Sequence, residues 1–394
     1  AGQDEAVERR GHGREGLDVG HAGGRAQEWD GTIVRSYSTR LQLPGWALRA
    51  GAVPRLCHPA PDWGIVTSAS LTGTGRDGMS VPLQTLQPAR ACANLFLDKE
   101  HPMTQQWQRI ASRLTDVGGI PVARAIPVKE RRTIGPWCFL DHIGPTRFAP
   151  GAPGMDVGPH PHIALQTFTW MLEGEILHRD SLGSKQVIRP GQVNLMTAGR
   201  GIAHTEESVP NQPDLHAAQL WIALPEADQH TPPRFDHYPT LPRWQQGEIT
   251  LTLLIGEHGS QRAPTLHFSP ILGLDLHAPE GGEITLPLDP AFEHGLFPLA
   301  GETIVAGEAL APEQLLYLPP GNREVALTLR PGARLLLIGG EPLPKPLQIW
   351  WNFVSVDKEA IRTAAADWES GHPRFGEVTG YQGPRLKAPP LTGL

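Results

Sequence analysis

Residues 159–175 read PHPHIALQTFTWMLEGE, and this stretch decides the fold class. Two histidines, His160 and His162, stand two positions apart after a turn-rich segment. Because side chains in a β-strand alternate between its two faces, both imidazoles point the same way. The apolar run that follows, with Phe168 and Trp170, ends at the turn Glu173-Gly174-Glu175 and is typical of a strand packed in a core. The core-packing residues expected here and in the next strands are Phe168, Trp170, Met171 and Met196.

The same alternation of short apolar runs and turns continues through most of the chain from Ile120 onward. Strands at a spacing of roughly 8–12 residues are typical of a sandwich or barrel. The 40 Pro and 44 Gly in 394 residues exceed the usual ~5% and ~7% and disfavour long helices. One helix is predicted over 357–368, where good helix formers follow an Asp. The predicted class is therefore all-β with a short C-terminal helix.

An internal similarity indicates two domains of similar build. Residues 169–176 resemble residues 296–303, and each copy is followed by a Pro turn and a strand. The boundary is expected within 236–243. The predicted domains are an N-terminal barrel over 103–238, a C-terminal barrel over 239–372, and a tail over 373–394 that is loose after Gly380.

The first 102 residues do not show the sequence pattern of a folded domain. They are rich in Gly, Arg and Pro and show no sustained period of 2 or 3.6. We expect mostly disorder there. From Met103 onward the pattern of apolar residues and turns is much clearer. A second hypothesis is therefore that residues 1–102 are a non-native extension translated from upstream sequence.

Composition excludes several classes of partner. A formal net charge of -7 provides no basic field for a phosphate backbone, so direct nucleic-acid binding is not expected. No apolar run approaches the roughly 20 residues of a membrane-spanning helix. Three cysteines without a close pair argue against a disulfide framework, and the charged first residues do not resemble a secretory signal. We therefore expect a cytoplasmic protein without membrane contact.

A second pair of candidate ligands follows the first. His204-Thr205-Glu206 repeats the two-residue spacing 42 residues after His162. If the two strands are neighbours, His160, His162, His204 and Glu206 converge. Three neutral imidazoles and a carboxylate suit Fe(II), Mn(II), Ni(II), Cu(II) or Zn(II) and leave one or two positions open for substrate. A zinc hydrolase on a (β/α)₈ barrel is the rival hypothesis, but residues 162–221 show no helical period.

The chain resembles the pirin family of bicupins over about residues 103–372. That resemblance implies two cupin-type β-barrels with one metal, usually iron, in the first. It assigns the ligands to the positions of His160, His162, His204 and Glu206. Many members carry Glu where this chain has Gln166, a departure that concerns hydrogen bonding around the site. The matching stretches are 139–145, 159–162, 171–175, 178–183, 196–206 and 349–355.

The second barrel is expected to be free of metal. The internal match carries the ligand positions onto residues that include no imidazole, and Glu293-His294 nearby is expected to be a surface turn. The matched positions are Pro287, Asp289, Ala326 and Thr328.

Two further motifs are weighed as partners of the metal ligands. His178-Arg179-Asp180 could orient an imidazole, although a solvated hairpin is favoured. Asp141-His142 stands before Gly144-Pro145 and is interpreted first as a structural turn. Trp350, Trp351 and Phe353 are predicted to pack the C-terminal segment against a barrel.

Some pirins are similar to quercetinases, which implies ring cleavage of a flavonol by O2 with release of carbon monoxide. Glu206 would then be both a ligand and the base that accepts the flavonol proton. The alternative is a redox-sensing regulatory protein that acts through protein partners, with Fe(II)/Fe(III) as its switch. A structural zinc site with a closed shell is the third hypothesis. A pocket wide enough for a three-ring flavonol above the metal would favour the dioxygenase.

Overall fold

The computed structural model describes residues 107–152 and 154–392. Before them it describes only four two-residue strands: β1 (Glu28–Trp29) pairs with β2 (Thr32–Ile33), and β3 (Gln42–Leu43) with β4 (Trp46–Ala47). Apart from these strands, the hypotheses on residues 1–102 lie outside the described residues and stay predictions. No helix among the described residues is long and apolar enough to cross a membrane. The chain divides into two compact units, Ala1–Asp98 and Lys99–Leu394, and the second holds everything that follows.

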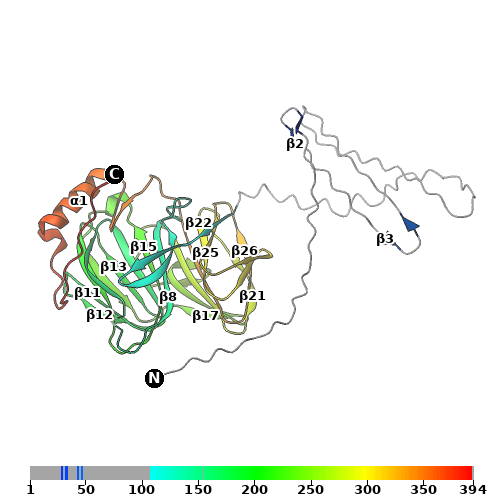
Figure 1. Cartoon of the computed structure of the whole chain (residues 1–394), viewed down its shortest axis with the longest axis horizontal. Coiled ribbons are helices and arrows are strands. Elements are labelled where there is room, and N and C mark those ends of the chain that lie inside the picture. Colours follow the sequence, from blue (N-terminus) through cyan, green and yellow to red (C-terminus); the bar gives the residue numbers. More distant parts are fainter. Residues whose placement is uncertain are drawn as a thin grey trace, which may run out of the picture. The chain divides into compact units, whose positions relative to one another are not determined.

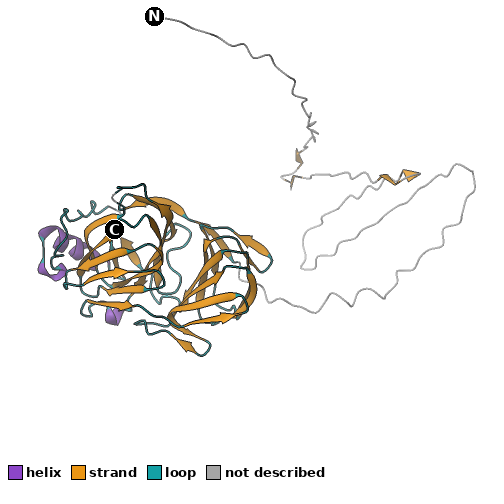
Figure 2. Ribbon diagram, turned by 90° about the horizontal axis from the view of Figure 1, so that it is seen from below, coloured by secondary structure: helices purple, strands orange, loops and turns teal. Residues whose placement is uncertain are grey.

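The second unit is built almost entirely of strands arranged as two β-barrels (Figure 2). The first barrel combines a seven-stranded sheet with a four-stranded one. In spatial order, the larger sheet contains β16 (Arg234–Tyr238), β13 (Val193–Thr197), β10 (Leu165–Glu173), β15 (Asp214–Ala223), β8 (Trp137–Arg147), β7 (Ile120–Ile126) and β6 (Arg113–Val117). The smaller contains β12 (Lys185–Ile188), β11 (Ile176–Asp180), β14 (Ile202–Ser208) and β9 (Asp156–His162).

The second barrel repeats this plan with an eight-stranded sheet and a four-stranded sheet. In spatial order, the larger sheet contains β17 (Arg243–Gln246), β18 (Ile249–His258), β20 (Ile271–Ala278), β27 (Ala333–Gly340), β22 (Glu293–Ala300), β25 (Gln314–Leu318) and β5 (Gln108–Ala111), with β19 (Gln261–Arg262) paired to β18. The smaller contains β21 (Gly282–Pro287), β26 (Glu324–Leu329), β23 (Thr303–Val305) and β24 (Glu308–Leu310). The prediction of an all-β, two-barrel architecture is confirmed.

Strand β5 departs from the predicted division of the chain. Residues 108–111 were expected in the first barrel, but β5 pairs with β25 in the second, with Ile110 opposite Leu315. Ile110 is buried in the core that both barrels share, which gives the pairing an apolar anchor. A four-residue strand carries too little periodicity to reveal its partner. Along the chain, β16 belongs to the first barrel and β17 to the second.

The interface between the barrels is a continuous part of the hydrophobic core. Phe168 and Trp170 of β10 pack in one cluster with Phe297 of β22. Trp137 donates its indole N–H to the carbonyl oxygens of Leu272 and Gly339, each at 3.1 Å. Met171 and Met196 are also fully buried, so the predicted core residues are confirmed as packing residues. The two barrels therefore share one hydrophobic cluster.

The C-terminal segment returns from the second barrel to the first and continues through β28 (Gln348–Trp350), β29 (Phe353–Ser355), α1 (Lys358–Ser370) and η2 (Pro373–Phe375). The predicted helix is confirmed. The carboxylate of Asp357 accepts a hydrogen bond from the Glu359 N–H at its start, and Gly371, at φ +71°, ends it in the left-handed conformation. Figure 1 shows α1 on the side of the first barrel that faces away from the second.

Residues 386–388 are docked, whereas the sequence predicted a loose tail after Gly380. The Leu386 N–H donates to the Pro159 carbonyl at 2.8 Å, and the Trp368 indole N–H donates to the Leu386 carbonyl at 2.8 Å. A side chain of Glu369 in α1 accepts from the Ala388 N–H. These partners come from distant elements, so local composition could not reveal them.

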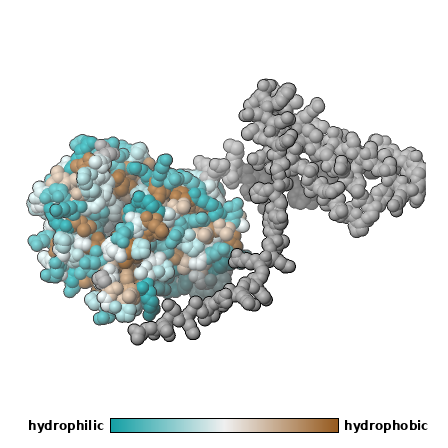
Figure 3. Space-filling model, in the orientation of Figure 1, coloured by the Kyte–Doolittle hydropathy of each residue, from teal (hydrophilic) through white to brown (hydrophobic). Residues whose placement is uncertain are grey.

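The surface of the described part is mixed in character. Figure 3 shows apolar residues scattered among polar ones on the face in view. The large apolar side chains that are exposed are Leu114, Leu182, Leu386 and Leu391.

Candidate metal centre

The predicted ligands lie on two neighbouring antiparallel strands, β9 and β14. His160 stands opposite His204, and His162 stands opposite Ile202. A bulge between His204 and Glu206 then places Glu206 opposite Val157. The two-residue spacing in β9 turns His160 and His162 to the same side of the strand, and His204 of β14 lies beside them.

Three imidazoles meet there. One ring nitrogen from each of His160, His162 and His204 lies within 4.8 Å of the other two. Their ring centroids are 4.2–5.1 Å apart, and all three side chains are buried. The Nε2 atoms of His162 and His204 are 3.1 Å apart. Two nitrogens bound to one ion at ~2.0–2.1 Å and at a right angle would be ~3 Å apart, so this spacing fits a shared metal.

The hydrogen bonds of the rings leave the correct nitrogens free. Nδ1–H of His160 donates to the Gly158 carbonyl at 2.9 Å, and Nδ1–H of His162 donates to the Asn352 carbonyl at 2.9 Å. In each ring Nε2 then keeps its lone pair for a metal. Nδ1 of His204 is buried without a partner among the described residues.

Burial also keeps the three imidazoles neutral. It lowers the pKa of His160 to about 4 and the pKa values of His162 and His204 well below the ordinary value. Neutral imidazole is the form that binds a metal ion. The donor set, the spacing and the protonation state therefore all fit a divalent cation.

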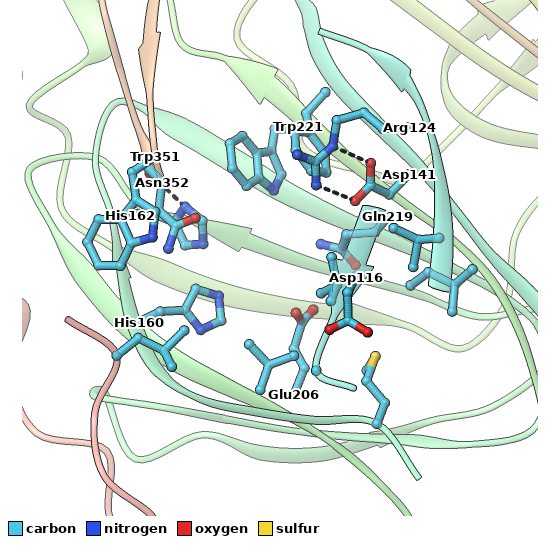
Figure 4. A pocket seen from close by; sticks show the side chains of 18 of the residues that line it. Asp116, Arg124, Asp141, His160, His162, Glu206, Gln219, Trp221, Trp351 and Asn352 are labelled. Carbon is cyan, nitrogen blue, oxygen red and sulfur yellow. Dashed lines mark hydrogen bonds and ion pairs between the residues drawn. The ribbon is translucent and has the colours of Figure 1, made fainter. Parts of the chain in front are cut away.

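Glu206 is placed differently from the histidines. Its carboxylate lines the same pocket (Figure 4) but is not among the three groups that converge within 4.8 Å. Burial, and next the nearby Asp141, raise the pKa of Glu206 to about 7. A cation held by the imidazoles would favour its ionised form. Its assignment as the fourth ligand stays a proposal.

A pocket of about 500 Å³ opens beside the imidazoles. This volume lies within the range of roughly 300–1,000 Å³ found for small-molecule sites. One wall is aromatic: Trp221 stacks on Phe139 with centroids 4.0 Å apart, and the His162 ring meets Trp221 edge-on at 5.1 Å. Arg124 and Asp141 form a bidentate ion pair at the same wall (Figure 4). The C-terminal segment adds Ile349, Trp351, Asn352 and Leu386.

Sequence reasoning missed several of these residues. Asp141 was interpreted as part of a turn, but it lies within β8 and lines the pocket. Arg124, Trp221 and the C-terminal residues carry no local motif. Only the pairing of β7, β8 and β15 and the return of the chain bring them to the site. The available signal was Asp141 itself, a charged residue within the mostly apolar run of β8, which indicates a side chain that faces a site.

Other candidates lie near the site without contacting the ligands by hydrogen bonds. His178 and Asp180 are buried and bonded to each other at 3.1 Å, so the solvated hairpin that was favoured is wrong. The His178 ring lies 5.3 Å from that of His204. Gln166 donates to the hydroxyl of Thr197 and to the Leu266 carbonyl, on the side of β10 that faces the second barrel.

In the second barrel, Glu293 and His294 belong to β22 and not to a surface turn. The carboxylate of Glu293 accepts hydrogen bonds from the Gly135 N–H and the Tyr317 hydroxyl, each at 2.7 Å. His294 is completely buried. That the second barrel binds no metal stays an expectation.

Comparison with known proteins gives consistent matches. A family model described as pirin matches residues 119–222, and one described as the pirin C-terminal cupin domain matches residues 273–376. A Pseudomonas aeruginosa protein, named provisionally as a quercetin 2,3-dioxygenase, is 54% identical over 285 residues, which are 72% of this chain and 90% of that protein. A pirin-like protein of Caulobacter vibrioides is 37% identical over 68% of this chain and 94% of its own length.

A solved structure agrees with these relatives. The crystal structure titled quercetin 2,3-dioxygenase from Acinetobacter baumannii is 45% identical and superposes with a TM-score of 0.72. The match covers 74% of this chain and 97% of that one.

Proposed function

The chain belongs to the pirin family, and we propose that it is a metal-dependent dioxygenase that opens the heterocyclic ring of flavonols such as quercetin with O2 and releases carbon monoxide. The names of the P. aeruginosa relative and the A. baumannii structure support this class. The observation that carries the proposal is the open pocket with an aromatic wall directly beside the imidazoles. A regulator that works through protein partners needs no such cavity.

The residues that would hold the ion are His160, His162 and His204, with Glu206 as the fourth ligand. Iron(II) is the proposed ion, because imidazole and carboxylate ligands suit it and it can exchange an electron with O2. When bound, the ion supplies Lewis acidity toward the hydroxyl-ketone oxygen pair of the flavonol and the redox chemistry that O2 requires.

Glu206 is proposed as the base. Its carboxylate faces the pocket beside the imidazoles, where it can accept the proton of the flavonol 3-hydroxyl. The resulting enolate is more electron-rich and reacts with O2 more readily. Both oxygen atoms of O2 enter the product, and one ring carbon leaves as carbon monoxide.

The pocket wall contributes binding and orientation. Phe139 and Trp221 stack on each other, and the parts of both rings that line the pocket offer apolar surface to a planar ring system. The hydrogen bond from His162 to the Asn352 carbonyl fixes one ligand ring through a residue of the C-terminal segment. Loss of this bond would loosen the ligand geometry without removing a ligand.

Oxygen consumption and carbon monoxide release with quercetin test the proposal. Iron-loaded protein should show both, and His162→Ala should lose both together with most of its bound iron. His230→Ala, an exposed histidine after the 3-10 helix η1 (Glu226–Asp228), is the matched control and should behave like wild type. Wild-type protein that holds one iron per chain and stays inert would contradict the dioxygenase and favour the redox-sensing regulator.

A further inference from the structure

The wall of the pocket away from the histidines carries polar groups that the proposed chemistry does not use. We propose that Arg124 and Asp141 together bind a ring hydroxyl of the aromatic ligand, so that the site selects polyhydroxylated aromatic compounds over unsubstituted ones. This inference rests on the proposed function, because it assumes that the oxygen pair of the ligand is held at the histidines. It specifies what the other end of the ligand must carry.

Two parallel rows of side chains cross the larger sheet of the first barrel. In the first row, Arg124 of β7 stands opposite Asp141 of β8, Asp141 opposite Gln219 of β15, and Gln219 opposite Thr169 of β10. In the second, Phe139 stands opposite Trp221. Phe139 and Trp221 lie two positions from Asp141 and Gln219 along their strands, so both rows occupy the same face. A polar row thus lies next to an aromatic row.

The aromatic row connects the metal site to the polar row. The His162 ring meets Trp221 at 5.1 Å, Trp221 stacks on Phe139 at 4.0 Å, and the guanidinium carbon of Arg124 lies 4.4 Å from the centre of the Phe139 ring. Figure 4 shows Trp221 between His162 and Arg124. A planar ligand that lies along this wall with one end at the histidines brings its other end to Arg124.

The polar row has unused hydrogen-bonding capacity. Arg124 donates from Nε and Nη2 to the two carboxylate oxygens of Asp141, each at 2.7 Å, and its Nη1 has no hydrogen-bond partner in the described part of the chain. Gln219 accepts from the Thr169 hydroxyl at 2.7 Å through Oε1, which leaves its amide N–H groups to donate. Each Asp141 oxygen can accept a further hydrogen bond.

These groups fit a neutral hydroxyl better than an anion. The charge of Arg124 is already balanced by Asp141, and Asp116 lines the same pocket, so a carboxylate on the ligand would meet like charge. A hydroxyl can accept from Arg124 or Gln219 and donate to Asp141. Arg124 and Asp141 are only 18% and 4% exposed, so an unsubstituted ring that covers them leaves polar groups without partners.

The ion pair also joins β7 to β8, so the experiment must separate recognition from packing. Arg334 and Asp275 of the second barrel supply a matched pair. Their side chains are 21% and 1% exposed, Arg334 donates from Nε to both oxygens of Asp275, and its guanidinium lies 5.7 Å from the centre of the Trp170 ring. This pair does not line the metal pocket.

Anaerobic calorimetry with iron-loaded protein tests the inference, because the ligand stays intact without O2. The probes are quercetin and 3-hydroxyflavone, which share the metal-binding oxygen pair and differ in the remaining ring hydroxyls. Wild type should bind quercetin about tenfold more tightly or better, as expected for a hydrogen bond to charged groups. Arg124→Gln should reduce this ratio to about twofold or less, and Arg334→Gln should retain it.

Asp141→Asn keeps a partner for Arg124 and provides a second variant if Arg124→Gln unfolds. It should also reduce the ratio, with bound iron unchanged. An unchanged ratio in a folded Arg124→Gln or Asp141→Asn protein, or a wild type that does not prefer quercetin, would overturn the inference. This experiment measures binding and not turnover. The preference for quercetin can therefore be lost in these variants even if wild type is inert with O2. Equally, an active enzyme can bind quercetin and 3-hydroxyflavone with the same affinity.

Discussion

At the scale of the residue, the account depends on which nitrogen of each histidine faces the cavity. The carbonyl oxygens of Gly158 and Asn352 accept from Nδ1 of His160 and His162 and so present Nε2 inward. Burial keeps these rings neutral. Both effects arise from the folded backbone, and they turn a spacing of histidines into a set of metal donors.

Glu206→Gln tests the role of the carboxylate. Three imidazoles remain, so the protein should still bind metal with reduced affinity. The loss of the base should lower the rate of oxygen consumption by about 10²–10⁴-fold, the usual contribution of a general base. The matched control is Glu207→Gln, because Glu207 lies on the same strand as Glu206, accepts a hydrogen bond from Arg179 of β11 and does not line the pocket. Equal rates for Glu206→Gln and wild type would remove Glu206 from the chemistry.

The residue scale also shows how far the sequence could predict the site. Two pairs of residues two positions apart were enough to predict that His160, His162 and His204 converge. The bulge before Glu206 was not predictable, because it depends on how β14 pairs with β9. Arg124 and Trp221 were missed since their place at the site depends on sheet order and not on a motif.

At the scale of the element, the C-terminal segment completes the site of the first barrel. Ile349, Trp351, Asn352 and Leu386 line the pocket, although they follow the second barrel in the chain. Tyr381 donates to the carboxylate of Asp156 at 3.0 Å, and the Leu386 N–H binds the Pro159 carbonyl, next to His160. The helix over 357–368 could be predicted from its helix-favouring residues and its N-capping Asp. The docking of residues 380–388 could not be predicted from the sequence.

Removal of residues 381–394 tests this element. The truncated protein should keep its bound metal, because no proposed ligand is lost, but bind quercetin several-fold more weakly as apolar surface at the pocket rim is removed. Leu386→Ala should reproduce part of the loss. Leu391→Ala, at an exposed position of the same tail, is the control and should bind like wild type. Truncation without any effect on binding would show that the tail does not shape the pocket.

At the scale of the whole molecule, the junction of the barrels contains a buried histidine pair. Nε2 of His142 lies 2.8 Å from Nε2 of His216, and His142 meets Phe297 of the second barrel edge-on at 5.7 Å. Burial, followed by the mutual proximity of the two rings, lowers the pKa of His142 to about 4. Burial, followed by Arg334, lowers the pKa of His216 to about 4, against the opposing effects of the Leu299 carbonyl and Asp275.

Acid should therefore loosen the molecule at this junction. Above pH 6.5 both rings are neutral in the folded and unfolded chain, so the pair adds no pH dependence. As pH falls from 6.5 toward 4, the unfolded chain takes up protons that the folded chain excludes, and stability decreases. At pH 5 the loss is about 2 kcal/mol for one such histidine. Urea unfolding of metal-free protein at pH 7.5 and pH 5.0 should show a smaller loss for His216→Gln than for wild type.

The same pair of measurements contains its control. His160, His162 and His204 contribute equally to the loss of stability in wild type and in His216→Gln. The difference between the losses of these two proteins therefore reports on the histidine pair at the junction. His230→Gln, which removes an exposed histidine, should lose as much stability as wild type. Identical losses for His216→Gln and wild type would mean that the pair titrates normally in the folded chain.

The most direct test of the central claim is the fate of the oxygen atoms. Iron-loaded protein is supplied with quercetin and ¹⁸O₂, and the product and the gas phase are examined by mass spectrometry. The proposed dioxygenase predicts a ring-opened product with two ¹⁸O atoms, one carbon monoxide per product, and loss of both signals in His162→Ala. An unlabelled product, or no product from protein that holds one iron per chain, would contradict it.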